Sequence, residues 1–251
     1  MTTSGTSSFN LDLNNLIEEA FERCGTELRS GYDMRTARRS LNLLTIEWAN
    51  RGINLWTVEQ GSFPVYQNKI TYDLPVDTID LLDHVIRTGT GPNQTDINIS
   101  RISESTYSTI PNKLATGRPI QIWVNRQSGA KYPAGGQPNG TDAITGVDSP
   151  QINLWPSPDQ GTLAAPYYTF VYWRLRRIQD AGNGLNTQDI PFRFLPCMVA
   201  GLAYYLSLKI PEATSRIEML KMSYEEQWAM ASTEDREKAP VRFVPRANFY
   251  A

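Results

Sequence analysis

The sequence is poor in the residues on which metal sites and many active sites depend. It holds one histidine and two cysteines among 251 residues. Cys24 and Cys197 each fall inside a helical pattern without the spacing of a CxxC motif or a zinc finger, so we expect buried, reduced thiols. A catalytic triad that uses His84 with Ser103 or Ser105 would need a framing motif such as G-x-S-x-G, which the sequence lacks. We therefore expect His84 to be a core or turn residue.

The sequence has no large excess of positive or negative charge and no long run of apolar residues. The 24 basic and 26 acidic side chains give a net charge of -2, so no overall basic field exists to hold nucleic acid from outside. A chain that lines a nucleic-acid channel is compatible with this charge, because such a wall should not bind its cargo tightly. Neither a charged-then-apolar leader nor a run of 18 apolar residues is present, so we expect no signal-peptide secretion and no membrane partner.

The acidic side chains match no known catalytic or metal-binding pattern. Asp77, Asp80 and Asp83 recur at every third position, but a calcium loop needs a glycine at its sharp turn and a bidentate glutamate at its end. Glu18–Glu19 and Glu225–Glu226 are adjacent pairs, and helical neighbours point about 100° apart rather than facing each other as glycosidase carboxylates do. We expect capping and solvent-exposed roles, with no catalytic residue, no metal and no cofactor.

A change from helical to strand-like patterning at Gly52 organises the rest of the chain. Leu41, Leu44 and Trp48 form one apolar stripe at helical spacing. The β-branched and aromatic run Leu55–Val58 directly after Gly52 predicts a strand.

Two N-terminal helices are predicted from periodicity and caps. Asn10 or Asp12 begins the first helix and Gly25 ends it, whereas Asp33 caps the second helix, expected over Met34–Arg51. Both helices offer too little apolar area to stand alone, so they need another helical partner.

Strands and turns fill the middle of the chain. Phe63–Val65 and Ile70–Leu74 alternate on either side of Gln67–Lys69, which predicts a hairpin. Ile97–Arg101 predicts one strand, and the Gly- and Pro-rich segment Ser128–Pro150 predicts a long exposed loop. Further strands are predicted over Ile79–Thr88, Ile120–Val124, Ile152–Trp155 and Tyr167–Leu175.

The last part of the chain returns to helical patterning. Phe192–Lys209 is apolar on nearly all sides, which predicts a helix at the centre of a bundle, and another helix follows Pro211. We predict an α+β fold in which the N- and C-terminal helices form an antiparallel bundle, with an antiparallel β subdomain inserted between them in the sequence. The predicted parts are a mobile N-terminus (1–9), the bundle (10–52 and 189–238), the insertion (53–188, with a long loop at 128–150) and an extended C-terminal arm (239–251).

Several short motifs recur in an order typical of a known family. They are Arg51–Glu59, Tyr72–Asp77, Arg101–Ser103, Ile110–Lys113, Gly117–Pro119, Leu154–Asp159, Leu175–Arg177 and Ala239–Arg242. Each is weak by itself, and their order and spacing from Asn10 to Pro245 carry the likeness. Together they resemble the head-to-tail adaptor (connector) family of short-tailed bacteriophages, of the packaged-DNA-stabilisation and tail-tubular-protein-A type.

The resemblance implies a structural protein of the virion rather than an enzyme. In that family a helical subdomain carries an inserted β subdomain, and twelve copies form a ring that extends the DNA channel. The implied partners are the other copies of the homo-oligomeric ring, the portal protein above, the tail nozzle protein below, and double-stranded DNA in transient passage. The implied location is the head-tail junction, after synthesis in the host cytoplasm.

Two kinds of partner site are predicted. The C-terminal arm is apolar, aromatic and too Pro-rich to build its own core, so we expect it to dock on the portal. Its contact residues are Pro240, Val241, Arg242, Phe243, Val244, Pro245, Arg246, Phe249 and Tyr250. Two arginine clusters are candidates for facing the DNA channel or for pairing between subunits: Arg35, Arg38 and Arg39 on one helical face, and Arg174, Arg176 and Arg177 at the end of the last strand.

Two other functional classes stay open from the sequence. A virion-associated cell-wall hydrolase is supported only by scattered acidic residues. A carbohydrate-binding module is supported by Trp123, Trp155 and Trp173 in the β subdomain. A turnover assay on peptidoglycan and the mass of the assembled particle separate these classes from an adaptor.

Overall fold

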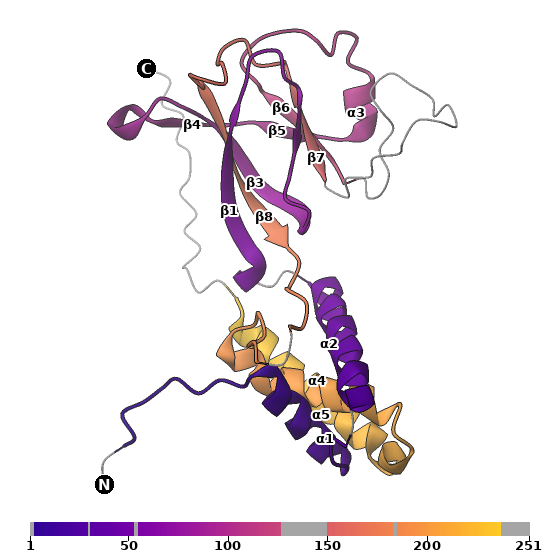
Figure 1. The fold of residues 1–251 in the computed structure, drawn as a ribbon. Coiled ribbons are helices and arrows are strands. Elements are labelled where there is room, and N and C mark those ends of the chain that lie inside the picture. The colour runs from indigo at the N-terminus through magenta and orange to yellow at the C-terminus, as the bar shows by residue number, and fades with distance from the viewer. Residues whose placement is uncertain (1–2, 30, 53–54, 127–149, 183–184, 237–251) are drawn as a thin grey trace, which may run out of the picture. The chain divides into compact units, whose positions relative to one another are not determined.

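Two compact units make up the chain, one helical and one built of sheets (Figure 1). The computed structural model describes residues 3–29, 31–52, 55–126, 150–182 and 185–236. The helical unit is made of Met1–Leu55 together with Ile178–Ala251, and the β unit is Trp56–Arg177. The predicted α+β class is therefore confirmed.

The helical unit is centred on α4 (Leu195–Ser207), in which ten of thirteen residues are buried. This helix packs against α1 (Leu13–Cys24), α2 (Gly31–Arg51) and α5 (Ile217–Glu234). A Cβ added at Gly201 of α4 would lie 2.9 Å from side-chain atoms of both Leu44 and Tyr224. The missing side chain at Gly201 thus lets residues of α2 and α5 approach α4 closely.

Local signals set the ends of α1. The Asp12 carboxylate accepts a hydrogen bond from the Asn15 amide at 2.8 Å, and Gly25 ends the helix with φ 82°. Both caps were predicted and are confirmed. The predicted cap of α2 is wrong: the helix begins at Gly31, so Asp33 lies in its first turn, where a negative charge favours the helix dipole.

The β unit consists of two four-stranded sheets, ordered β1-β8-β3-β4 and β2-β7-β6-β5. Their bounds are β1 Val58–Val65, β2 Thr71–Asp73, β3 Thr78–Thr88, β4 Thr95–Asn98, β5 Ser100–Ile102, β6 Gln121–Asn125, β7 Gln151–Trp155 and β8 Tyr168–Arg176. The pair β5–β6 is parallel, which corrects the purely antiparallel insertion. A parallel pair needs a crossover, and the segment with helix α3 (Glu104–Ser108) supplies it.

The core of the β unit is shared by both sheets. Ile86 and Phe170 from the first sheet and Ile122 and Ile152 from the second are all 0% exposed and belong to one apolar cluster. Alternation along the strands places these side chains on one face of each sheet, so burying that face holds the two sheets together.

The predicted hairpin at Gln67–Lys69 is wrong, because the two strands beside it belong to different sheets. Strand β1 pairs with β8, and β2 pairs with β7. The amide of Gln67 donates to the Gly161 carbonyl at 2.8 Å, and the amide of Asn68 donates to the Pro158 carbonyl at 3.0 Å. These contacts anchor the turn to another segment. Alternation predicts strands but not the sheet to which each belongs.

The predicted strand Ile97–Arg101 is likewise two strands in two sheets. Strand β4 ends at Asn98 and β5 begins at Ser100, with the buried Ile99 between them. The predicted strand at Leu55 also begins later, because Leu55–Thr57 forms a short helical turn before β1.

The β unit ends at Arg177 by its contacts, whereas the insertion was predicted to reach residue 188. Backbone contacts explain the difference: the Leu13 amide donates to the Asn186 carbonyl at 3.1 Å, and Asp12 forms a bridge with Thr187. These contacts tie the segment before α4 to the start of α1. Most of the predicted loop 128–150 and the whole arm 239–251 lie outside the described residues.

Candidate functional site

Arg174 lies inside the β unit, where its charge is already neutralised. Its guanidinium donates to Asp77 at 2.5 Å, to Glu59 at 2.7 Å and to the Thr78 hydroxyl at 2.9 Å, and the residue is 7% exposed. Burial alone would lower the pKa of Arg174, but the bonds to Asp77 and Glu59 outweigh it and raise the pKa. The prediction that Arg174 faces a DNA channel or a neighbouring subunit is therefore corrected.

Arg176 and Arg177 lie at the end of the same strand but do not share this environment. The side chain of Arg176 donates to the Arg177 carbonyl at 3.1 Å, and the Arg177 amide donates to the Asp77 carbonyl at 2.8 Å. Arg177 is exposed, whereas Arg176 is half-buried. The three arginines therefore do not act as one basic group.

Arg35, Arg38 and Arg39 lie together on α2, where they line a hollow of about 480 Å³ with Tyr32. None of the three arginines forms an ion pair with a residue in the described ranges. Burial, and then the charge of Arg39, lower the pKa of the nearby Lys209. The surface thus carries positive charge that the described part of the chain does not neutralise, which suits carboxylate or phosphate partners.

The three tryptophans of the carbohydrate-binding alternative do not form one platform. Trp123 and Trp155 lie on β6 and β7 of one sheet, whereas Trp173 lies on β8 of the other. The ring of Trp123 stacks on Tyr107 of α3 at 4.9 Å, and the Trp155 indole donates to the Asn112 carbonyl at 3.0 Å. Both rings therefore hold the α3 segment against the sheet rather than offering a shared surface to a sugar.

His84 and the aspartates near it take part in contacts of the β unit. The His84 ring stacks 6.2 Å from Phe170, and both ring nitrogens are buried without a hydrogen-bond partner among the described residues. Asp80 accepts from Arg101 at 2.9 Å, just as Asp77 accepts from its own arginine. No group of three or more His, Cys, Asp or Glu side chains in the described ranges is placed to hold a metal.

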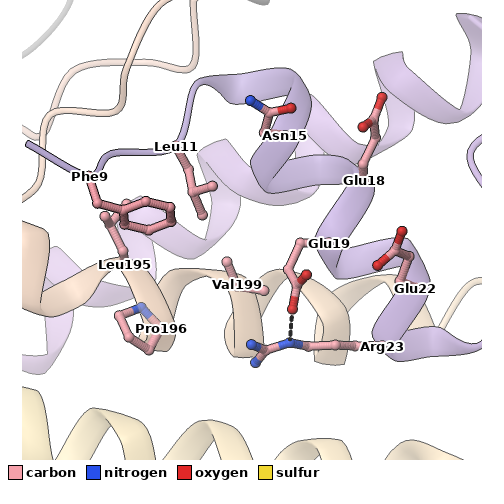
Figure 2. Close-up of a pocket in the computed structure, with 10 residues that line it drawn as sticks. All are labelled: Phe9, Leu11, Asn15, Glu18, Glu19, Glu22, Arg23, Leu195, Pro196 and Val199. Carbon is pink, nitrogen blue, oxygen red and sulfur yellow. Dashed lines mark hydrogen bonds and ion pairs between the residues drawn. The ribbon is translucent and has the colours of Figure 1, made fainter. Parts of the chain in front are cut away.

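A groove on the helical unit was missed by sequence reasoning (Figure 2). It encloses about 540 Å³ and is lined by Phe9, Leu11, Asn15, Glu18, Glu19, Glu22, Arg23, Leu195, Pro196 and Val199. Figure 2 shows its apolar side chains gathered where the N-terminal segment meets α4, with the glutamates along α1. Glu19 pairs with Arg23 at 3.0 Å, so the rim keeps an acidic excess.

The groove suits an apolar segment that carries basic side chains. Acidic residues at helical spacing on the polar face of α1 were the signal in the sequence. By themselves these residues indicated only a face exposed to solvent. The groove stayed hidden in the sequence because much of its apolar half comes from α4, which is far from α1 along the chain, and the rest from residues just before α1.

The two cysteines are buried and free, as predicted. Burial raises the pKa of Cys24 to about 11 and that of Cys197 to about 12, so both thiols are protonated near neutral pH.

The predicted contact residues of the arm, within 240–250, lie outside the described residues. In the described part of the chain, no helix combines the length and the apolar character needed to cross a membrane. Comparison of the sequence with protein-family models found no matching family, and comparison with curated proteins found no match.

Proposed function

We propose that this chain is a structural subunit of a phage head-to-tail adaptor and that it acts without catalysis. Copies of it form a ring that docks on the portal, extends the DNA channel and receives the tail nozzle. The ordered motifs between Asn10 and Pro245 are the observation that carries the proposal. The division of the chain supports it, because both chain ends contribute to the helical unit and the β unit is one continuous insertion.

Within the helical unit, α1, α2, α4 and α5 form one antiparallel bundle in this proposal. Contacts of α4 with each of the other three helices support it. So do the ring contacts of Trp48 on α2 with Phe194 and Trp228, at 5.5 and 5.2 Å. A bundle of this kind leaves the outer sides of α2 and α5 available to neighbouring copies.

The C-terminal arm is the portal-docking element of this proposal, with its valines and aromatic residues as anchors. Six arginines were predicted to face the channel or to pair between subunits, and the proposal leaves out Arg174 because it is buried and paired within its own chain. Arg35, Arg38 and Arg39 are better placed for such contacts, because the described residues offer them no ion-pair partner.

The test is to mix the purified chain with portal rings of the same phage and to follow binding by sedimentation velocity. The chain alone should sediment as a monomer or weak oligomer, and with portal it should move as a larger complex. Electron microscopy should then reveal a second ring stacked on the portal. Portal rings of an unrelated phage are the control.

Two results would contradict the proposal. One is failure to co-sediment with the portal at any ratio. The other is turnover of peptidoglycan by the purified chain, which would favour the cell-wall hydrolase.

A further inference from the structure

A basic face runs along the exposed side of α2. It consists of Tyr32, Arg35, Arg39, Leu43 and Ile46, which recur at helical spacing. Its apolar members are well exposed: Leu43 is 54% exposed and Ile46 is 46% exposed. Exposed apolar side chains that adjoin one another on one helix mark a surface for a partner.

Two hollows open on the basic face, each of about 480 Å³. Tyr32 and Arg39 line both of them, and Leu43 lines the one that extends towards the end of α4. In the other hollow the buried Nε of Arg38 has no hydrogen-bond partner among the described residues. The basic face is therefore concave and borders the unsatisfied donor of Arg38. Its charge is positive on balance, because Asp33 is the one acidic residue that lines either hollow, whereas Arg35, Arg38, Arg39 and Lys209 are basic.

A methionine face lies on the exposed side of α5. It consists of Met219, Met222, Glu226 and Met230, at spacings of three and four residues. The three methionines are 60%, 74% and 51% exposed. Glu218 beside them is also exposed, and with Glu226 it outweighs the single nearby Lys221. This face is a row of long, adaptable, exposed side chains with a net negative charge.

The two faces are opposite in charge, and long exposed side chains on one can fill hollows on the other. We infer that the methionine face of one copy docks on the basic face of a second copy. This inference rests on the proposed function, in which the second copy is the neighbouring subunit of the ring. The methionine side chains enter the two hollows. Glu218 and Glu226 approach Arg35 and Arg39, which lack ion-pair partners in the described part of their own chain.

The contact is head-to-tail because its two surfaces come from different helices. Each copy presents one basic face and one methionine face, and both are exposed in the single chain. A heterologous contact of this kind continues from copy to copy, and it forms a closed ring when the rotation between neighbours divides a full turn. The α2 arginines are thus assigned to pairing between subunits.

Two single variants test the contact by sedimentation equilibrium over a range of concentrations. Leu43→Glu places a carboxylate on the basic face, opposite Glu218 and Glu226, and Met222→Lys places an ammonium group on the methionine face, opposite Arg35 and Arg39. The wild type should self-associate as concentration rises, and each variant alone should associate at least about tenfold more weakly. An equimolar mixture of the two variants should form dimers that grow no further, because each supplies the one intact face that the other lacks.

The matched control is Leu114→Glu on the β unit, where the native side chain is 74% exposed and belongs to neither face. It should associate like the wild type. A wild type that stays monomeric up to its solubility limit overturns the inference. So do variants with wild-type association, or a mixture that stays monomeric.

The portal co-sedimentation assay separates this inference from the proposed function. If the wild type binds portal rings and the Leu43→Glu and Met222→Lys variants self-associate like the wild type, the adaptor role stands and this contact is removed. Mixed dimers without any portal binding would remove the adaptor role and keep the contact.

Discussion

Trp48 donates its indole N–H to the hydroxyl of Tyr224 at 2.9 Å, across 176 positions of the sequence. The Tyr224 hydroxyl in turn donates to Glu47 at 3.2 Å, and the Tyr205 hydroxyl donates to the other carboxylate oxygen of Glu47 at 2.6 Å. One network therefore joins α2, α4 and α5. We expect the N- and C-terminal helices to unfold together, because breaking any one of these helices away leaves buried polar groups unpaired.

Trp48→Ala should lower the free energy of unfolding by roughly 3–5 kcal/mol, because it leaves a large cavity beside α4. Leu206→Ala, at a residue 1% exposed, should cost about 2–5 kcal/mol for the same reason. Urea unfolding followed by circular dichroism measures both. Leu163→Ala, at a site 82% exposed, is the control and should leave the midpoint unchanged. Wild-type midpoints for both core variants would show that these residues are not in a packed core.

Tyr224→Phe should lower the free energy of unfolding by roughly 1–3 kcal/mol, because the Trp48 N–H loses its partner inside the core. Burial, and then the charge of Glu47, raise the pKa of Tyr224, so the hydroxyl stays protonated and able to donate. Thermal unfolding measures the loss. The double variant Trp48→Phe with Tyr224→Phe should lose less than the sum of the single variants. Strict additivity would argue against the hydrogen bond.

Asp77→Ala should destabilise the protein by roughly 1–3 kcal/mol, because the buried guanidinium of Arg174 loses its closest carboxylate. Chemical denaturation of the full chain measures the effect. Asp96→Ala is the matched control: it removes the partner of Arg87 from an exposed pair, which should change stability very little. Equal effects of the two substitutions would contradict the burial of the Arg174 cluster.

The free energy of unfolding should fall as the pH drops below about 6.5, the ordinary pKa of histidine, because protonation of His84 favours the unfolded chain. Burial, and then the charge of Arg101, lower the pKa of folded His84, although the charge of Asp83 opposes the shift. The unfolded chain therefore takes up the proton at a higher pH than the folded chain. The stability that depends on neutral His84 is fully present above pH 6.5, and it is lost progressively between that value and the lower folded pKa.

The test for His84 is to compare unfolding free energies of the wild type and His84→Gln from pH 5 to 8, the range in which an ordinary histidine titrates. The variant should lack the histidine-linked loss. Because the chain has a single histidine, proton NMR can also follow its titration directly. A folded pKa at or above 6.5 would contradict the prediction.

Deleting residues 240–251 should leave the melting temperature nearly unchanged and abolish attachment to portal rings. The anchors of the arm must offset an ordering cost of about 1–2 kcal/mol per residue fixed, so Val241, Phe243 and Val244 should carry most of the binding. Co-sedimentation with the portal measures attachment, and Leu114→Glu is again the control. Native affinity after the deletion would remove the arm from the portal contact. A truncated chain that fails to fold would instead show that the arm packs on its own subunit.

The sequence by itself determined the elements whose signals are local. The limits of α1 follow from Asp12 and Gly25, whose cap contacts span only a few residues. The burial of α4 follows from a nearly continuous apolar run, and strands such as β6 follow from alternating residues of high β-propensity. These signals need no knowledge of what lies elsewhere in the chain.

Only the tertiary structure decided which segments meet. Strands β1 and β2 alternate as a hairpin would, yet the turn between them is held by the Pro158–Gly161 segment, and each strand joins a different sheet. Arg174 reads as a surface charge in the sequence, but partners 97 and 115 positions away bury and neutralise it. The groove beside α1 and the exposure of the α5 methionines likewise depend on how helices distant in the sequence pack together, so the sequence alone did not predict them. Helix periods and caps depend on neighbours along the chain, whereas sheet pairing, ion pairing and exposure depend on residues that are brought close only by folding.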